Sequence, residues 1–147
     1  MISIEKVKKL RNITGVSITE CKKALEKANG DIEKAKDVLK KLGKDVAEKR
    51  SYRETKAGIV DSYIHANKRV GVLIQLNCET DFVAKSDDFK KLSHELCLHI
   101  AGFFDDVPVM EQPWIKDSKK TVKDLIDGYI AKFGENITLE QFIRYEI

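Results

Sequence analysis

Apolar residues recur at every third or fourth position of residues 1–43, a spacing that places them on one face of an α-helix. Three such stretches follow one another, separated at Gly15 and at Asn29-Gly30, residues that tolerate the left-handed conformation at a helix end. The apolar positions are Ile4, Val7 and Leu10, then Ile18, Cys21, Leu25 and Ala28, then Ile32, Ala35, Val38, Leu39 and Leu42. The pattern predicts a module of three helices, with Gly43 ending the third.

Polar residues indicate where these helices begin. Ser17, with Glu20 three residues later, predicts a capping box, and Asp31 can cap the third helix. Residues 44–56 are mostly charged and cannot form a full apolar face. We therefore expect a charged linker at 44–56, either a solvated helix or a flexible connector, between residues 1–43 and a second module at 57–147.

The second module begins with an alternating pattern typical of a β-hairpin. The predicted strands are 58–65 and 69–78, and Asn67 in the connection suits a turn that needs a positive φ. The residues that share one face of the second strand are Val70, Val72, Ile74, Leu76 and Cys78. This strand is expected to lie against a core.

Two helices and a last strand are predicted to follow. The helices run from about Ser86 to Phe103 and from a cap at Thr121 to Gly134. Residues 136–147 alternate again, with Ile137, Leu139, Ile143, Tyr145 and Ile147 at the apolar positions. Strands at both ends with helices between them predict an antiparallel sheet packed with helices. The whole chain is thus expected to be α+β.

The turn between the buried strand and the following helix carries an aromatic residue. Such turns lie at the surface, where Phe82 gains little free energy unless a partner covers it. Asp81 beside it is expected to cap the turn. The alternative interpretation is that Phe82 packs into the protein's own core under the helix.

Composition indicates a globular chain, with 42% hydrophobic and 35% charged residues among 147. No apolar run reaches the roughly 20 residues that cross a bilayer, and the N-terminus does not resemble a secretory signal. Cys21, Cys78 and Cys97 are odd in number and lie on apolar faces, which favours buried thiols over disulfides. We expect a cytoplasmic protein.

The motifs of common catalytic and phosphate-binding sites do not occur in the sequence. His94 and His99 are five residues apart and point in different directions on a helix, so they cannot share a metal ion. We expect one buried Cys and two partly exposed His on that helix. The sequence predicts no metal, no cofactor and no enzymatic activity.

The net charge of +3 conceals an asymmetry, because residues 1–56 are net basic and residues 57–147 are net acidic. The basic residues of the first module could bind nucleic acid or an acidic peptide. Against nucleic acid, this module has no aromatic residue to stack on a base, and acidic residues lie among the basic ones. A small nucleic-acid or peptide adaptor is the alternative function, and no direct nucleic-acid partner is expected.

Three blocks of this chain resemble the elongation factor Ts family. Residues 10–15, 20–25 and 28–35 are similar to its ubiquitin-associated-like N-terminal domain, and residues 80–85 to its T-D-F-V-A-K segment. Residues 111–117, 130–137 and 142–146 are similar to its C-terminal ending. The blocks occur in the family's order.

The resemblance implies a translation factor that promotes GDP release from elongation factor Tu, binding the GDP form. It implies that Phe82 inserts between helices of the partner's nucleotide domain, and that Arg11 and the loop from Gly15 to Thr19 dock on that domain. The contact residues expected from it are Arg11, Gly15, Val16, Ser17, Ile18, Thr19, Thr80, Asp81, Phe82 and Val83.

Two departures from the family are visible. Long members have a second core subdomain and a coiled-coil insertion, for which this chain has no room, so a homodimer could supply the missing contacts. In the last strand, Glu140-Gln141 stands where the family often has two Arg. A basic contact with the partner at that point is therefore not expected to be preserved.

Overall fold

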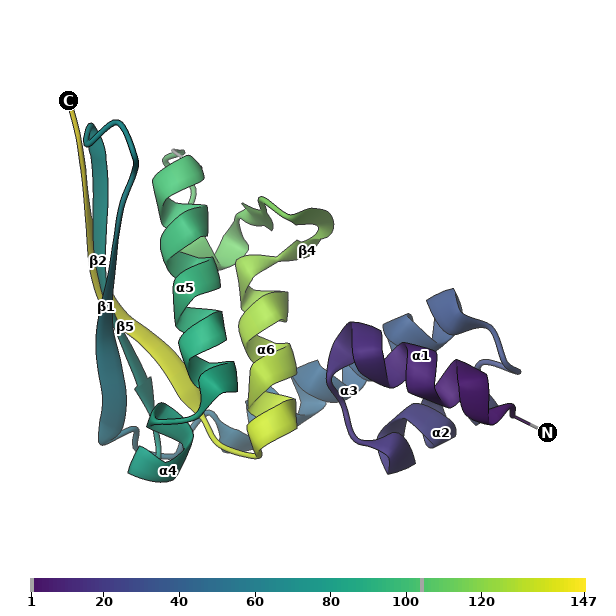
Figure 1. The fold of residues 1–147 in the computed structure, drawn as a ribbon. Coiled ribbons are helices and arrows are strands. Elements are labelled where there is room, and N and C mark those ends of the chain that lie inside the picture. The colour runs from purple at the N-terminus through teal and green to yellow at the C-terminus, as the bar shows by residue number, and fades with distance from the viewer. Residues whose placement is uncertain (1, 104) are drawn as a thin grey trace.

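The computed structural model describes residues 2–103 and 105–147, which form a helical bundle beside a sheet-and-helix layer (Figure 1). The bundle contains α1 (Ile4–Thr14), α2 (Ile18–Lys27) and α3 (Ile32–Arg50). The layer contains β1 (Ala57–Ile64), β2 (Val70–Cys78), α4 (Asp81–Ala84), α5 (Asp87–Gly102), η1 (Val109–Glu111), β3 (Pro113–Trp114), β4 (Asp117–Thr121), α6 (Val122–Phe133) and β5 (Ile137–Glu146). The predicted α+β class is confirmed.

The bundle forms its own small core from the predicted apolar faces. Its buried residues are Val7, Leu10, Cys21, Ala24, Leu25, Ala28, Ala35 and Leu39. Ser17 accepts a hydrogen bond from the Glu20 N–H and Asp31 from the Lys34 N–H, so both residues cap their helices as predicted, although of the predicted capping box only the Ser17 half is present. Gly15 ends α1 in the left-handed conformation, with a φ of 71°.

The predicted end of the third helix at Gly43 is wrong, because α3 continues to Arg50. Gly43 is buried where α3 crosses α6, and a methyl group there would lie in ordinary contact with α6, 3.4 Å from the Asp127 carbonyl oxygen. The helix continues through Gly43 because this part of α3 packs on α6. Ala47, one turn later, belongs to the core of the second module. Residues 44–50 of the expected linker are therefore helical, the first of the two alternatives; Ala47 is buried, while Lys44, Asp45, Glu48 and Lys49 are exposed.

Ion pairs reinforce this crossing. Asp124 on α6 lies 3.2 Å from Lys40 Nζ and 3.6 Å from Lys44 Nζ. Burial by itself would raise the pKa of Asp124, but the hydrogen bond from the Thr121 N–H and the Lys40 ammonium outweigh it and hold that pKa below its ordinary value. Asp124 also completes the capping box of α6 with Thr121, at the helix start that the sequence predicts.

The sheet is antiparallel with strand order β1-β2-β5, so β2 is central. The hairpin occurs where predicted, but the positive φ in its turn belongs to Lys68, at 60°, and not to Asn67. Asn67 Oδ1 instead accepts a hydrogen bond from the Arg69 N–H.

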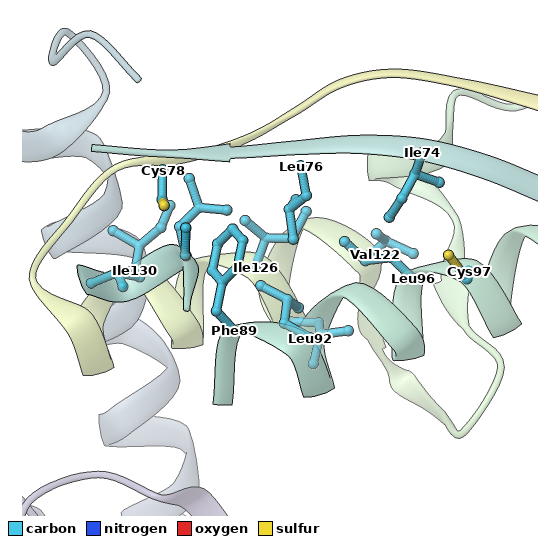
Figure 2. Close-up of a cluster of buried hydrophobic side chains, with 14 of the residues drawn as sticks. Ile74, Leu76, Cys78, Phe89, Leu92, Leu96, Cys97, Val122, Ile126 and Ile130 are labelled. Carbon is cyan, nitrogen blue, oxygen red and sulfur yellow. The ribbon is translucent and has the colours of Figure 1, made fainter. Parts of the chain in front are cut away.

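One apolar layer fills the space between the sheet and the two long helices α5 and α6 (Figure 2). Its largest fully buried side chains include Ile74 and Leu76 from β2, Phe89 and Leu92 from α5, and Ile126 from α6. Burial raises the pKa of Cys78 to about 11 and that of Cys97 to about 12, so these thiols are protonated and unreactive as expected.

A β-bulge divides β5 into two parts that face opposite sides of the sheet. Leu76 pairs with Leu139 while the next residue back, Gln75, pairs with Gln141, which leaves Glu140 as an extra residue. Ile137 is buried in the core and Leu139 packs against it, whereas Ile143 is 42% and Tyr145 69% exposed. The single apolar face that the alternation of 136–147 suggests therefore does not exist.

His99 differs from its expected state, because it is fully buried while His94 is exposed. Its Nε2 lies 2.8 Å from Gln112 Oε1, and its Nδ1 accepts a hydrogen bond of 3.2 Å from the Ile115 N–H. Nδ1 is therefore unprotonated and Nε2 donates to Gln112. This contact ties the β3–β4 hairpin, which the sequence pattern did not reveal, to α5.

We expect His99 to make the protein less stable in mild acid. Burial lowers the pKa of His99 below its ordinary value of 6.5. As the pH falls below 6.5, His99 binds a proton in the unfolded chain but not yet in the folded protein. The contribution of His99 to the free energy of unfolding is therefore fully present above pH 6.5 and is lost as the pH falls toward the lower pKa of the folded state. The contribution cannot exceed about 1.4 kcal/mol per pH unit. Urea unfolding between pH 5 and 8 measures the slope, and His99→Gln is expected to flatten it; equal slopes would refute the assignment.

Candidate protein-binding surface

Phe82 is held at the surface on a single helical turn. Its side chain is 88% exposed, so the alternative that it packs into the protein's own core is wrong. The two following residues, Val83 and Ala84, are 5% and 3% exposed and anchor α4 in the core. Phe82 therefore projects outward from a turn whose other apolar side chains are fixed.

Thr80, and not Asp81, caps this turn. Thr80 Oγ1 accepts a hydrogen bond of 3.3 Å from the Val83 N–H. Asp81 is the first residue of α4 and its side chain is exposed, so the expected capping role of Asp81 is wrong. Its carboxylate lies at the end of the helix that favours negative charge. Ser86 caps α5 directly afterwards, at the helix start that the sequence predicts.

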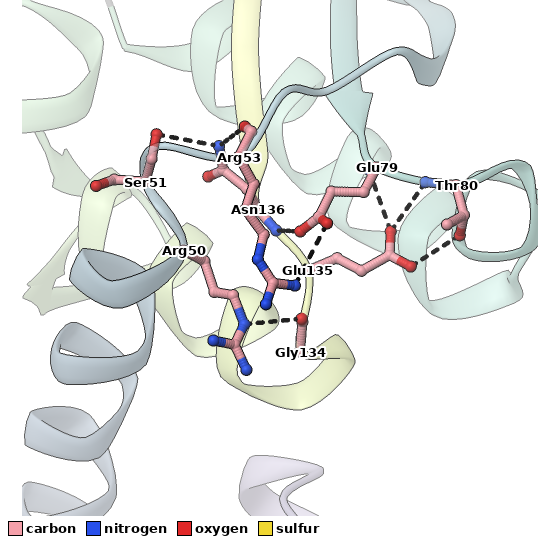
Figure 3. Close-up of polar contacts among 8 residues, drawn as sticks. All are labelled: Arg50, Ser51, Arg53, Glu79, Thr80, Gly134, Glu135 and Asn136. Carbon is pink, nitrogen blue, oxygen red and sulfur yellow. Dashed lines mark hydrogen bonds and ion pairs between the residues drawn. The ribbon is translucent and has the colours of Figure 1, made fainter.

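A set of polar contacts holds the Thr80 turn against the turn that joins α6 to β5 (Figure 3). Glu135 Oε1 accepts hydrogen bonds of 3.1 Å from both the Glu79 and the Thr80 N–H groups, and its Oε2 accepts one of 2.8 Å from the Thr80 hydroxyl. In return, Glu79 Oε2 accepts one of 2.6 Å from the Asn136 N–H. We call these four residues the glutamate clasp.

The clasp also binds the segment that connects α3 to β1. Arg53 Nη1 lies 3.5 Å from Glu79 Oε1, and Asn136 Nδ2 donates to the Arg53 carbonyl oxygen at 2.9 Å. Arg50 Nε donates to the Gly134 carbonyl oxygen at 3.1 Å. The charged connector is therefore fastened to the second module beside the Phe82 turn.

The second predicted contact segment lies on the helical bundle. Arg11, Gly15, Ser17, Ile18 and Thr19 are exposed, and Val16 is half-buried. Ile18 is 52% exposed beside a shallow groove between α1 and α2 that is also lined by Ile4, Lys8 and Lys22. An apolar surface bordered by lysines suits a partner surface that combines apolar and acidic groups.

Lys132, near the end of α6, lies between the two predicted segments. Its Nζ forms an ion pair of 3.0 Å with Asp88, in the first turn of α5 after Phe82. A methyl group at Gly15 would lie 3.0 Å from the same Nζ. The fold thus brings the Gly15 loop and the Phe82 turn to one end of the molecule, although they are far apart in the sequence.

The sequence did not reveal Glu135 and Asn136 as part of this surface. Glu79 and Glu135 are separated by most of the second module, and nothing in the local pattern at either position indicates that they meet. The signals available there were the family-like block at residues 130–137 and Gly134, which ends α6 with a φ of 70°.

Within residues 2–103 and 105–147, no three His, Cys, Asp or Glu side chains gather where they could hold a metal ion. In the same part of the chain no helix is long and apolar enough to cross a membrane. The most prominent chemical feature is one large exposed aromatic side chain on a fixed turn.

Comparisons with known proteins agree with this picture. A family model described as "Elongation factor TS" matches residues 79–147. The elongation factor Ts of Thermotoga sp. is 41% identical over 191 residues, with 99% of this chain and 96% of the relative covered. That of Coprothermobacter proteolyticus is 39% identical over 193 residues, with 99% and 98% covered.

The fold defines an α+β protein with an N-terminal helical bundle and an exposed aromatic side chain on a fixed turn. The similarity over nearly the whole chain shows which one: the chain belongs to the elongation factor Ts family, whose members are translation elongation factors. The alignments extend over 191 to 194 residues, more than the 147 residues of this chain. These relatives therefore contain residues that this chain lacks, in keeping with its short form.

Truncation of two phenylalanines near each other in the sequence is expected to change the free energy of unfolding by very different amounts. Phe89 is fully buried, so Phe89→Ala should lower the free energy of unfolding by roughly 3–5 kcal/mol. Phe82→Ala should change it by less than about 0.5 kcal/mol, as for other exposed sites. Urea unfolding of both variants measures this, and a large loss for Phe82→Ala would show that the side chain packs against the protein itself.

Proposed function

We propose that this protein is a guanine-nucleotide exchange factor for elongation factor Tu, which binds the GDP form and promotes release of GDP. The observation that carries the proposal is the exposure of Phe82 on a turn fixed from both sides. Family membership supports the choice of partner. The protein breaks and forms no covalent bond in this role, so it acts by binding and not as an enzyme.

The energetics of exchange fit an anchor of this kind. Coupling between two bound ligands is reciprocal, so the exchange factor weakens GDP binding as much as GDP weakens the factor's binding. A thousandfold loss of GDP affinity needs about 4 kcal/mol of differential interaction. One well-buried aromatic anchor supplies roughly 2–4 kcal/mol at an interface, which suits Phe82 as the largest single contribution.

The helical bundle supplies the second contact in this proposal. Arg11 and the loop from Gly15 to Thr19 dock on the nucleotide domain of the partner, at the same end of the molecule as Phe82. Asp81 and Thr80 border the aromatic anchor, and Val83 supports it from the core. A salt titration of binding distinguishes this proposal from the alternative of a nucleic-acid adaptor. Phosphate binding weakens steeply with salt, whereas binding through an interface centred on Phe82 does not.

Phe82→Ala is expected to reduce stimulated GDP release at least tenfold, because the anchor's differential contact is lost while the fold remains. Release of fluorescent GDP from elongation factor Tu, with increasing exchange factor, measures the effect. Ile115→Ala serves as the matched control, since Ile115 is another large apolar residue, 44% exposed, that lies outside both contact segments. Unchanged release with well-folded Phe82→Ala would contradict the proposed role of this side chain.

A homodimer is part of the proposal, through the face of the sheet that lies away from α5 and α6. In the described part of the chain no helix covers this face (Figure 1). Leu73 and Ile143 are register partners across β2 and β5 and are 48% and 42% exposed. Val60, Ile64 and Tyr145 are between 61% and 69% exposed. An apolar face and the free edge of β5 both favour pairing with a second copy.

Leu73→Lys is expected to shift the protein to monomer, because it places a charge at the centre of this apolar face. Sedimentation equilibrium over the micromolar range compares it with the original protein and with Ile13→Lys, an equivalent change at a residue 50% exposed on the bundle. A monomeric original protein at high micromolar concentration would rule out this dimer.

A further inference from the structure

Phe82 has almost no contacts of its own that could fix its direction. At 88% exposure it can be oriented only through the backbone of its turn. That turn, α4, is four residues long, and so short a helix does not form without external contacts. The burial of Val83 and Ala84 fixes its C-terminal half, so what fixes the N-terminal half decides where Phe82 points.

The carboxylate of Glu135 performs that task in the structure. It accepts the N–H groups of Glu79 and Thr80, the two residues that lead into α4, at 3.1 Å each. A carboxylate that accepts backbone N–H groups forms charge-assisted hydrogen bonds, which are stronger than neutral ones. One side chain from the α6–β5 turn thereby fixes two consecutive peptide groups on the way to Phe82.

Glu135 also determines how Thr80 caps the turn. A hydroxyl group has one proton, and that of Thr80 is donated to Glu135 Oε2 at 2.8 Å. The Thr80 oxygen is then oriented to accept the Val83 N–H. Loss of the Glu135 carboxylate would free the Thr80 side chain to rotate and the cap to open.

The contacts of Glu135 lie outside the apolar core. Among the described residues its side chain hydrogen-bonds to the Glu79–Thr80 turn alone, where Thr80 is exposed to solvent and Glu79 is half-buried. Water can replace these hydrogen bonds after truncation, so the fold itself depends little on them. The effect of Glu135 should therefore fall on the direction of Phe82 more than on overall stability.

We propose that Glu135 is a positioning residue that holds Phe82 in its outward, binding-ready direction. This inference rests on the proposed function, because Phe82 must be the anchor for its direction to matter. If only a fraction of molecules present Phe82 correctly, the apparent dissociation constant rises by the inverse of that fraction. Once bound, the anchor is in place, so the maximal rate of GDP release is retained.

The test measures GDP release against the concentration of exchange factor for Glu135→Ala. The expected result is a half-saturating concentration raised about three- to tenfold at an unchanged maximal rate, in contrast to the lower maximal rate expected for Phe82→Ala. Glu111→Ala is the matched control, since it removes an exposed carboxylate for which the described residues show no hydrogen bond or ion pair. An unchanged half-saturating concentration for Glu135→Ala would overturn the inference.

Two further variants separate positioning from direct contact with the partner. In a background of Phe82→Ala, Glu135→Ala should cause no additional loss, because it acts through the missing side chain. An equal, additive loss in both backgrounds would overturn the inference. Glu135→Gln keeps an oxygen for the two N–H groups and should recover most of the original half-saturating concentration; failure of this rescue in a folded variant would also count against it.

Amide hydrogen exchange of the free protein provides a measurement that does not need elongation factor Tu. Exchange at Val83, whose N–H is bonded to the Thr80 cap, should be at least tenfold faster in Glu135→Ala than in the original protein. Equal exchange would overturn the positioning role even if nucleotide release were affected. If the original protein did not accelerate GDP release at all, the proposed function would fail, and that outcome is distinct from a failure of Glu135 alone.

Discussion

The rest of the structure depends on one apolar layer between the central strand β2 and the helices α5 and α6. Leu76, Phe89 and Ile126 are buried there by three different elements, and each contributes roughly 1.5–3 kcal/mol by leaving water. This layer fixes the end of β2, and α4 follows that end directly. The position of the exposed turn is thus set by the core, although Phe82 itself lies outside it.

Phe82 is an exception to the burial of large apolar side chains that stabilises this core. A large aromatic side chain left in water gives up stabilisation, and the surrounding residues hold it there instead of letting it fold inward. Val83 and Ala84 anchor one side of the turn in the apolar layer, while the glutamate clasp holds the other side with polar contacts. An exposed apolar group on a fixed backbone loses little conformational entropy on binding, which favours tight contact with a partner.

The helical bundle packs directly against the second module and is not joined to it by a flexible linker alone. α3 extends through the crossing at Gly43 and ends beside the clasp, where Arg50 bonds to Gly134. The Gly15 loop lies beside the Lys132 side chain of α6. Both contact segments are therefore presented from one packed framework, and the proposed double contact with a partner needs little rearrangement of the modules.

The sequence by itself determined the existence of the long helices, the strands of the main sheet and the α+β class, because the apolar periods and the caps at Ser17, Asp31 and Thr121 are local signals. It also singled out Phe82, since an aromatic residue directly after a buried strand and a Thr-Asp pair is unusual. Resemblance to a family supplied the expected function, which no local pattern contains.

Only the tertiary structure decided the features that depend on residues distant in the sequence. Gly43 carries the local signal of a helix end, but α3 continues through it because Gly43 and Ala47 are buried in packing that the local sequence does not show. Glu140 looks like any alternating position, yet the pairing with β2 makes it a bulge that turns Ile143 and Tyr145 outward. Glu135 has no local signal of its role, because a carboxylate acquires a function at the Phe82 turn only when folding brings two separate turns within hydrogen-bonding distance.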